Sequence, residues 1–345
     1  MKKLSLVFVM VLVAGMAMAQ NVATTVQNGN TNVASVGQTG SNTGVVDQLL
    51  GDNNLGTLTQ VGYRNDAIIM QGLTNVGVGV FSGQNMGASN NVGYISQVGG
   101  NDNEGAVYQL GDHNNGQIST NGSGNNAQIY QGWSSIDGGY TTSGNSNSSV
   151  LSQTGAGNTA LAWQYGGVWG EKSNVNNVTQ NGNSNWATVA QGYIYPTNSK
   201  GITPIYGAAV TGNTSNIAQL NGDWNLARFF QLGKNNTVSL SQNGSNNNVG
   251  AERTTGGTSL DGYFYQTGNG NEFYGTQTGG ATLKKKSAQV GNDNDIFLTQ
   301  GAGDVAEIIQ AGDLNGAFLT QMGGGQNATI LQTGIGNSAT VTQGN

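Results

Sequence analysis

The chain has 345 residues, of which 58 are glycine, 2 are proline, none is cysteine and only 8% are charged. This composition excludes an ordinary globular domain and a disulfide-stapled secreted domain, and it is typical of either prion-like disorder or a repeat array. The formal net charge of −6 excludes a nucleic-acid-binding surface.

The N-terminal segment has the pattern of a secretory signal peptide. Lys2 and Lys3 precede an apolar run over residues 4–14, and Ala17 and Ala19 form a small-x-small cleavage site. The run is too short for a membrane span. We therefore expect residues 1–19 to be removed on export, so that the mature chain begins near Gln20, outside the cytoplasm and without a membrane span.

From Gln27 onward an 11-residue unit recurs, Q-x-G-x-x-N-x-A-x-Φ-x-Q, where Φ is apolar. It is cleanest near the C-terminus, where Gln310, Gln321, Gln332 and Gln343 follow one another at intervals of 11. Asn, Ala, Φ and the closing Gln share one parity, so a strand points all four to the same side. The x-G-x-x segment is typical of a turn, because glycine adopts positive φ without steric cost. The periodicity favours a repeat array over disorder.

Irregular loops are expected where the spacing of the unit fails, near residues 165–179, 192–215 and 251–265. The second of these contains both prolines, Pro196 and Pro204. Since proline cannot donate to a sheet ladder, we expect this loop to bulge out of the array. The lysine run at residues 284–286 is self-repulsive in a stacked sheet, so it is expected to face solvent or to break a strand.

Two units folded as strand, turn and strand make a coil of about 22 residues whose inner faces meet. Stacking such coils over residues 20–345 predicts an all-β, amyloid-like β-solenoid of roughly 15 coils, in which Gln stacks on Gln and Asn on Asn. Each buried amide then donates to one neighbouring coil and accepts from the other, which offsets the cost of burying it. The expected ladder residues are Gln27, Asn32, Gln38, Gln60, Asn65, Gln71, Gln153, Asn158, Gln164, Gln180, Asn185, Gln191, Gln231, Asn236, Gln242, Gln289, Asn294, Gln300, Gln310, Asn315, Gln321, Gln332, Asn337 and Gln343.

These units resemble the repeats of curlins, the subunits of bacterial curli fibres, which have Q-x-G-x-G-N-x-A-x-x-x-Q at their centre. The closest matches begin at Gln153 and Gln332, whereas the unit that begins at Gln266 has Phe273 in place of the Ala. The resemblance implies a secreted subunit of an extracellular amyloid fibre, or fimbrium, that self-assembles and serves cell adhesion and the biofilm matrix. It also implies the partners: further copies of the chain, another curlin-type subunit, a periplasmic chaperone and an outer-membrane secretion pore.

No catalytic, metal or cofactor site is expected. His113 is the only histidine and lies in an Asp-His-Asn turn sequence, so neither a histidine-based metal cluster nor a Ser-His-Asp arrangement is available. A second hypothesis is a monomeric secreted β-solenoid that binds a polysaccharide or another surface through one flat face; it predicts a capped C-terminus and a regular outward row of Thr or aromatic residues. A third, a polysaccharide-cleaving enzyme, requires converging carboxylates, which the sequence does not indicate.

Overall fold

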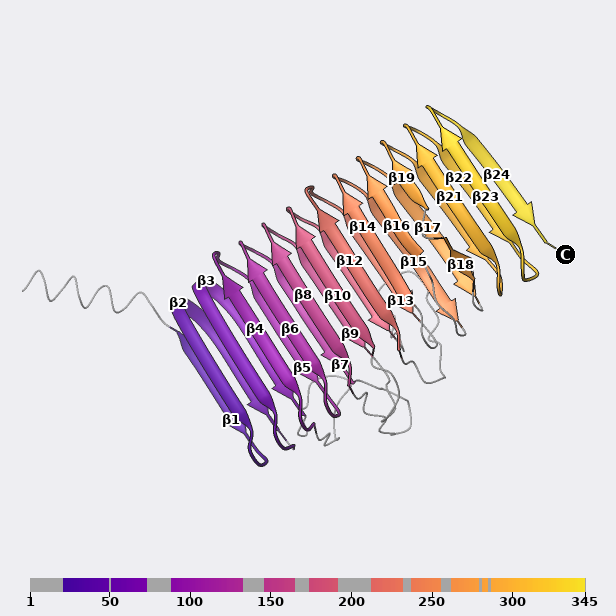
Figure 1. Ribbon diagram of the computed structural model, residues 1–345. Helices are drawn as coiled ribbons and strands as arrows, with labels where there is room; N and C mark the ends of the chain where they lie inside the picture. The colour runs from indigo at the N-terminus through magenta and orange to yellow at the C-terminus, as the bar shows by residue number, and fades with distance from the viewer. Residues whose placement is uncertain are drawn as a thin grey trace, which may run out of the picture.

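The structure is a computed structural model that describes residues 21–49, 51–72, 88–132, 146–164, 174–191, 212–231, 237–255, 262–278, 281–284 and 287–344. Within these ranges the regular structure consists of 24 β-strands without a helix. The described part of the chain accordingly contains no helix of the length and apolarity that crossing a membrane requires. Figure 1 shows the strands side by side in one elongated array, from β1 at the indigo end to β24 at the yellow end.

The strands form two stacks, which we call the first and the second stack. Strands β2 (Val33–Gln48) and β3 (Leu55–Gln71) run through a turn and contribute to both, their C-terminal halves to the first stack and their N-terminal halves to the second. The first stack begins with β1 (Val22–Gln27), continues through those two C-terminal halves, and then contains β5 (Glu104–Gln109), β7 (Asn126–Gln131), β9 (Thr159–Gln164), β11 (Trp186–Gln191), β13 (Leu226–Gln231), β15 (Asn248–Thr255), β17 (Glu272–Thr278), β20 (Asp295–Gln300), β22 (Gly316–Gln321) and β24 (Ser338–Gln343).

The second stack begins with the N-terminal halves of β2 and β3. It continues through β4 (Val92–Val98), β6 (Asn115–Asn121), β8 (Ser148–Thr154), β10 (Val175–Asn181), β12 (Thr214–Leu220), β14 (Thr237–Asn243), β16 (Gly262–Thr267), the interrupted pair β18 (Thr282–Leu283) and β19 (Ala288–Val290), β21 (Val305–Ala311) and β23 (Asn327–Thr333).

All strand pairs are parallel, and glutamines stack on glutamines: Gln27 aligns with Gln48, and Gln48 with Gln71. Bonded glutamines in uninterrupted steps are 21 to 24 residues apart in the sequence, which confirms the predicted β-solenoid. The described chain makes about a dozen coils, fewer than the roughly 15 expected. The reason is that other steps take 27 to 39 residues, so long connections use up part of the chain.

The core is thin and is filled by pairing small residues of one stack with apolar residues of the other. Inward side chains alternate with outward ones, as in β7, where every second residue is buried. A Cβ atom at Gly56 would lie 2.5 Å from Cγ1 of the buried Val46 in the facing stack. Where Phe273 replaces the usual Ala, Gly275 leaves space for its ring, which lies 2.7 Å from the position of a Cβ on that glycine. A small residue therefore compensates for a large one either in the facing stack or two places along the same strand.

Turns that lead from the second stack back to the first are short and form what we call the glycine edge. It consists of Gly40, Gly62, Gly100, Gly122, Gly155, Gly182, Gly222, Gly244, Gly268, Gly291, Gly312 and Gly334. At Gly155 φ is +111°, and a Cβ atom would lie 2.0 Å from the carbonyl oxygen of Gly182 in the next coil. Both the backbone conformation and the close approach of successive coils therefore require glycine there.

A second turn position also has a left-handed backbone, directly before the turn asparagine. It is glycine in some coils, with φ of 67° at Gly157 and 71° at Gly336, but it is Arg64, Trp224 or Leu314 in others, with φ of 55°, 61° and 59°. A non-glycine residue in this conformation costs about 1 kcal/mol. Tertiary stacking thus imposes the turn geometry even where the local sequence disfavours it.

The expected irregular segments coincide with the connections from the first stack to the second. Residues 165–173, 192–211 with both prolines, and 256–261 lie outside the described residues. The expected loops were drawn too wide, because residues 175–179, 251–255 and 262–265 form most of strands β10, β15 and β16, and residues 214–215 begin β12. Of the lysine run only Lys284 is among the described residues; it directly follows the last residue of β18, and its Nζ lies 3.5 Å from Oε2 of Glu307 in the next coil. His113 occupies a turn with φ of 60°.

Candidate assembly site: the stacked carboxamides

Carboxamide ladders run along the inside of both stacks. In the first stack the Nε2 of each described glutamine donates to the Oε1 of the next, over 2.7 to 3.0 Å, in the series Gln27, Gln48, Gln71, Gln109, Gln131, Gln164 and Gln191. Gln300, Gln321 and Gln343 continue the same pattern at 2.9 and 2.8 Å. In all of these bonds the donor lies nearer the N-terminal end of the solenoid and the acceptor nearer the C-terminal end. The ladder therefore has a direction, which we call its polarity.

The second stack has an equivalent ladder of the same polarity. Donation from Nε2 to Oε1 over 2.6 to 2.9 Å links Gln38 to Gln60 and Gln97, and then Gln153 to Gln180, Gln219, Gln242, Gln266, Gln289, Gln310 and Gln332. Interior amides also reach backbone carbonyls. The Nε2 of Gln48 lies 2.9 Å from the oxygen of Val33 and 3.0 Å from that of Asn54. Most of the described amides of the core thereby find hydrogen-bond partners within the protein.

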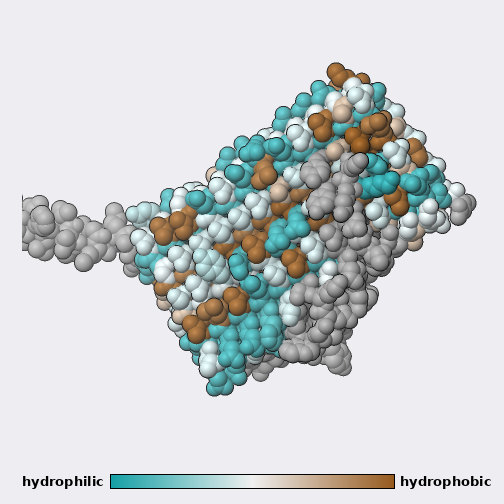
Figure 2. Space-filling view, in the orientation of Figure 1, coloured by the Kyte–Doolittle hydropathy of each residue, from teal (hydrophilic) through white to brown (hydrophobic). Residues whose placement is uncertain are grey.

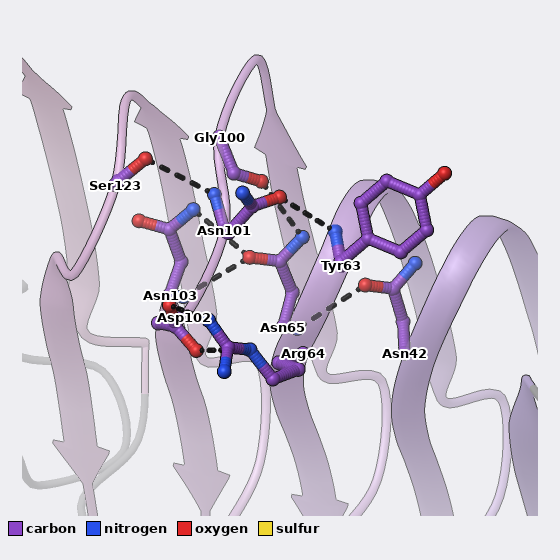
Figure 3. A network of polar contacts seen from close by, with 9 residues as sticks. All are labelled: Asn42, Tyr63, Arg64, Asn65, Gly100, Asn101, Asp102, Asn103 and Ser123. Carbon is purple, nitrogen blue, oxygen red and sulfur yellow. Dashed lines mark hydrogen bonds and ion pairs between the residues drawn. The ribbon is translucent and has the colours of Figure 1, made fainter.

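Asparagines of the glycine edge form a third ladder with the opposite polarity, shown in Figure 3. The backbone N–H of Asn65 donates to Oδ1 of Asn42 over 3.1 Å, and the N–H and Nδ2 of Asn103 both donate to Oδ1 of Asn65 over 3.0 Å. The Nδ2 of Asn65 donates to the carbonyl of Gly100 over 3.2 Å. Asn65 therefore ties its turn to both neighbouring coils.

An ion pair on the same turns lies outside this ladder. Arg64 and Asp102 are 2.8 Å apart and mostly exposed, and each directly precedes a ladder asparagine. Because exposed pairs contribute at most about 1 kcal/mol, this contact adds little to the stability of the turns.

The structure brings most of the expected ladder residues into the interior. All the described ones are buried except those of the end coils: Gln27 and Asn337 are exposed, and Asn32, Gln38 and Gln343 are half-buried. Asn236 and the side chain of Gln231 lie outside what the structure describes. Ladder members that sequence reasoning left out include Gln48, Gln97, Gln109, Gln131, Gln219, Gln266, Asn42, Asn103 and Asn125. They occupy the same inward positions of their strands as the expected residues. They were missed because the intervals between successive units in these segments depart from 11 residues.

One described coil breaks the glutamine ladder. Thr120 takes the place of a glutamine between Gln97 and Gln153, and it is 1% exposed. Its Oγ1 and the Oε1 of Gln153 are both buried without a hydrogen-bond partner. A buried unsatisfied polar atom costs about 1 to 3 kcal/mol. This coil is therefore a local defect in the ladder.

Thr120→Gln is expected to raise the free energy of unfolding by about 1 to 2 kcal/mol, because the new amide would accept from Gln97 and donate to Gln153. The measurement is the urea midpoint followed by far-ultraviolet circular dichroism. Ser119→Gln, on the outward face of the same strand, serves as the matched control and should leave the midpoint unchanged. A lower midpoint for Thr120→Gln would contradict the prediction by showing that the coil has no room for the amide.

The outer surface carries two carboxyl groups whose pKa is raised. Burial raises the pKa of Asp47 above 3.8, and its Oδ1 has no hydrogen-bond partner among the described atoms. Its neighbours in the stack are Val26 and Met70, which explains the poor solvation. The pKa of Asp295 is raised by burial and, secondarily, by the charge of Asp293.

The protein is expected to be more stable in mild acid than at neutral pH because of Asp47. A raised folded-state pKa means that the folded chain holds a proton which the unfolded chain has already lost, so the free energy of unfolding falls as the pH rises through this window above 3.8. Asp47→Asn should therefore raise the urea midpoint at pH 7 and leave it near the wild-type value at pH 3.5. An equal gain at both pH values would assign the effect to something other than ionisation.

Exposed apolar side chains are scattered rather than gathered into one patch. Figure 2 shows hydrophobic residues in short, separate groups among hydrophilic ones on the face in view. Some of the exposed rings are stacked along the first stack: Phe297 lies between Tyr274 and Phe318, with ring centroids 5.4 and 5.1 Å away and planes within 14° and 2° of parallel. These rings form a short outward aromatic row.

Comparison with known proteins agrees with this geometry. No curated protein matches the chain. The family model of the Curlin associated repeat matches at two places, residues 211–244 and 312–344. The first match contains strands β12, β13 and β14, and the second contains β22, β23 and β24. Both segments contain the stacked amides described above, so the chain carries the Curlin associated repeat at these two places.

Proposed function

We propose that this protein is a secreted structural subunit of an extracellular, curli-like amyloid fibre that grows by stacking of β-strands and has no catalytic role. The Curlin associated repeat supports the proposal, since proteins of that family are structural subunits. The polar ladders support it as well, because a solenoid held together by in-register parallel strands and stacked amides has the internal architecture of a cross-β fibre.

The observation that carries the proposal is the state of the two end coils. Within the described chain, Nε2 of Gln332 and Nε2 of Gln343 donate to backbone carbonyls but to no further glutamine. At the other end, Gln27 and Gln38 donate to the next coil, and no described glutamine donates to them. One end thus offers ladder donors and the other offers ladder acceptors, which is the complementarity that head-to-tail growth requires.

Adhesion and a place in the biofilm matrix are part of the same proposal. Their support is the repeat family together with the signal-peptide pattern of residues 1–19. By the same reasoning the chain crosses the periplasm unfolded, with a chaperone, and leaves through an outer-membrane pore. Folding before export would produce an end that captures other copies in the wrong compartment.

The test is to follow the purified chain from Gln20 with an amyloid-binding dye and to record fibre diffraction. Growing fibres with a meridional reflection at about 4.7 to 4.8 Å are expected. A chain that stays monomeric and gives no such reflection would contradict the proposal.

A paired variant separates growth from folding. The N–H groups of Gly316 and Met322 donate forward to the carbonyls of Asn337 and Gln343, so the alternation of a parallel ladder points the N–H of Thr340 toward the open edge. The same alternation applies to Thr329 in β23, since the N–H of Val305 donates to the carbonyl of Gln326.

Thr329→Pro with Thr340→Pro should leave the monomer folded and abolish fibre growth, because proline removes only donors unused within the chain. Thr329→Ala with Thr340→Ala is the control and should assemble normally.

The aromatic row favours a second candidate function, binding of a polysaccharide by a flat face. Tyr274, Phe297 and Phe318 are about 40% exposed (39%, 39% and 42%) and lie nearly parallel, as sugar-stacking rings do. Replacement of all three by alanine should lower retention on immobilised matrix polysaccharides while fibre growth continues. Unchanged retention would leave the fibre as the sole proposed function.

A further inference from the structure

The number of strands sets how one copy can stack on the next. Twelve successive pairings join thirteen segments in the first stack. The second stack contains twelve, with β18 and β19 counted as one interrupted strand. The described solenoid therefore begins and ends with a first-stack strand, β1 and β24. It contains an odd number of half-coils.

With an odd number of half-coils, two copies that are related only by translation along the fibre axis cannot continue both stacks. If β1 of the next copy paired with β24, the first stack would be continuous. The second stack would then jump from β23 to the N-terminal half of the next β2, with room for one strand left empty between them. That gap, of about 4.8 Å beyond the normal spacing, would leave the backbone edge of β23 unpaired inside the fibre. The Gln332 amide would also lack a ladder partner.

A half turn about the long axis removes the gap, because both stacks are built from the same unit. With the next copy rotated, its β1 pairs with β23, and the N-terminal half of its β2 pairs with β24. Gln27 of the next copy then aligns with Gln332, and its Gln38 aligns with Gln343. Each of these pairs spans the same 11 residues, so both glutamines register at once.

Turn residues register in the same arrangement. Gly29 and Asn32 follow Gln27 by two and five residues, as Gly334 and Asn337 follow Gln332. Within the chain, the carbonyl of each glycine on the glycine edge packs over the preceding glycine, as Gly334 does over Gly312 at 2.0 Å from a Cβ position. No such carbonyl faces Gly334 itself. The carbonyl of Gly29 of the next copy would fill that place.

At the junction between two copies, donors face acceptors in both the glutamine ladders and the asparagine ladder. Nε2 of Gln332 and of Gln343 would donate to Oε1 of Gln27 and Gln38 of the next copy, as every forward glutamine bond does inside the chain. Asparagines donate in the reverse direction: N–H and Nδ2 of Asn337 both donate to Asn315. Oδ1 of Asn337 would accept from Asn32 of the next copy. Donor meets acceptor at all three positions.

We infer that successive copies in the fibre are related by a half turn, so that β1 of one copy stacks on β23 of the copy before it and the first and second stacks exchange sides at every junction. The inference rests on the proposed fibre function and specifies the contact by which that fibre grows. One copy contributes about 60 Å of rise, at about 4.8 Å per coil, so the axial repeat of the fibre is about 120 Å.

Cysteine pairs test the register, and the chain has no cysteine of its own. Thr24 is exposed on β1 and would lie beside Thr329 of the previous copy, three places before the aligned glutamines. Thr340 is the equivalent exposed residue on β24 and would be Thr24's neighbour only without the half turn. The two double variants, Thr24→Cys/Thr329→Cys and Thr24→Cys/Thr340→Cys, are assembled, confirmed as fibres by dye and diffraction, oxidised mildly and dissolved without reductant.

The half turn predicts a ladder of covalent multimers from Thr24→Cys/Thr329→Cys and monomer from Thr24→Cys/Thr340→Cys. Adjacent strands place the predicted pair about 4.8 Å apart, within the range that a disulfide bridges, whereas the other pair would lie on opposite faces of the fibre. The reverse pattern, or fibres in which neither pair forms multimers, would overturn the half turn and leave the fibre function intact. Absence of fibres from the wild-type chain would overturn both.

Discussion

Gln109→Ala is expected to lower the free energy of unfolding by about 4 kcal/mol. Gln109 is fully buried; it accepts from Gln71 over 2.8 Å and donates to Gln131 over 3.0 Å, and its Nε2 also lies 2.8 Å from the carbonyl of Val92. Truncation leaves a cavity in a close-packed core and unsatisfied partners on both sides. The measurement is a urea titration by circular dichroism at a concentration too low for assembly.

Two further variants separate the amide from the volume of the side chain. Gln109→Met keeps most of the volume but loses the hydrogen bonds, and it should lose about half as much stability as the alanine variant. Gln117→Ala removes an outward glutamine whose Nε2 bonds only to Asn115 of its own strand, and it should change stability by less than about 0.5 kcal/mol. Equal losses for Gln109→Ala and Gln117→Ala would mean that the ladder amides do not hold the coils together.

Gly182→Ala is expected to be at least as damaging, with a loss of about 4 kcal/mol or failure of the central coils to form. Its φ is +137°, and a Cβ atom would lie 2.0 Å from the carbonyl oxygen of Gly222. Neither the strained backbone nor the backbone clash can be relieved by rotating a side chain, so the two coils must separate. Thermal unfolding monitored by circular dichroism measures the effect.

Gly37→Ala is the matched control, because Gly37 lies in the N-terminal half of β2 with nothing within 4 Å of its Cβ position and without a positive φ. Alanine there should be neutral or should stabilise the strand by about 0.5 kcal/mol. If Gly182→Ala were as mild as Gly37→Ala, the close approach of successive coils along the glycine edge would be wrong.

The regular strands and turns could be predicted from the sequence, because each 11-residue unit contains the residue pattern of one strand and one turn. The shared parity of Asn, Ala, Φ and Gln predicts one inward face, and the interior of β22 to β24 follows it residue by residue. Turn conformation was predictable at the first glycine but not at Leu314, which adopts φ of 59° against its own preference. Stacking of neighbouring turns overrides local propensity there.

Which glutamine stacks on which was harder to predict from the sequence. Gln60 bonds to Gln97, 37 residues away, and not to a glutamine one regular coil further on. A long connection changes which residues meet without changing the pattern of either strand. The same effect concealed Gln109 and Gln131 as ladder members, whereas Thr120 is a local substitution at the regular glutamine position, 11 residues after Gln109.

By itself the sequence determined that this chain is a stack of short strands with an amide-lined interior, since the alternation of side chains along a strand is local and repeats with every unit. Only the tertiary structure decided which strands are neighbours, where the ladder is broken and that the two stacks differ by one strand. Those properties depend on the path of the connections between strands, and that path is settled by packing and hydrogen bonding between coils rather than by any local preference.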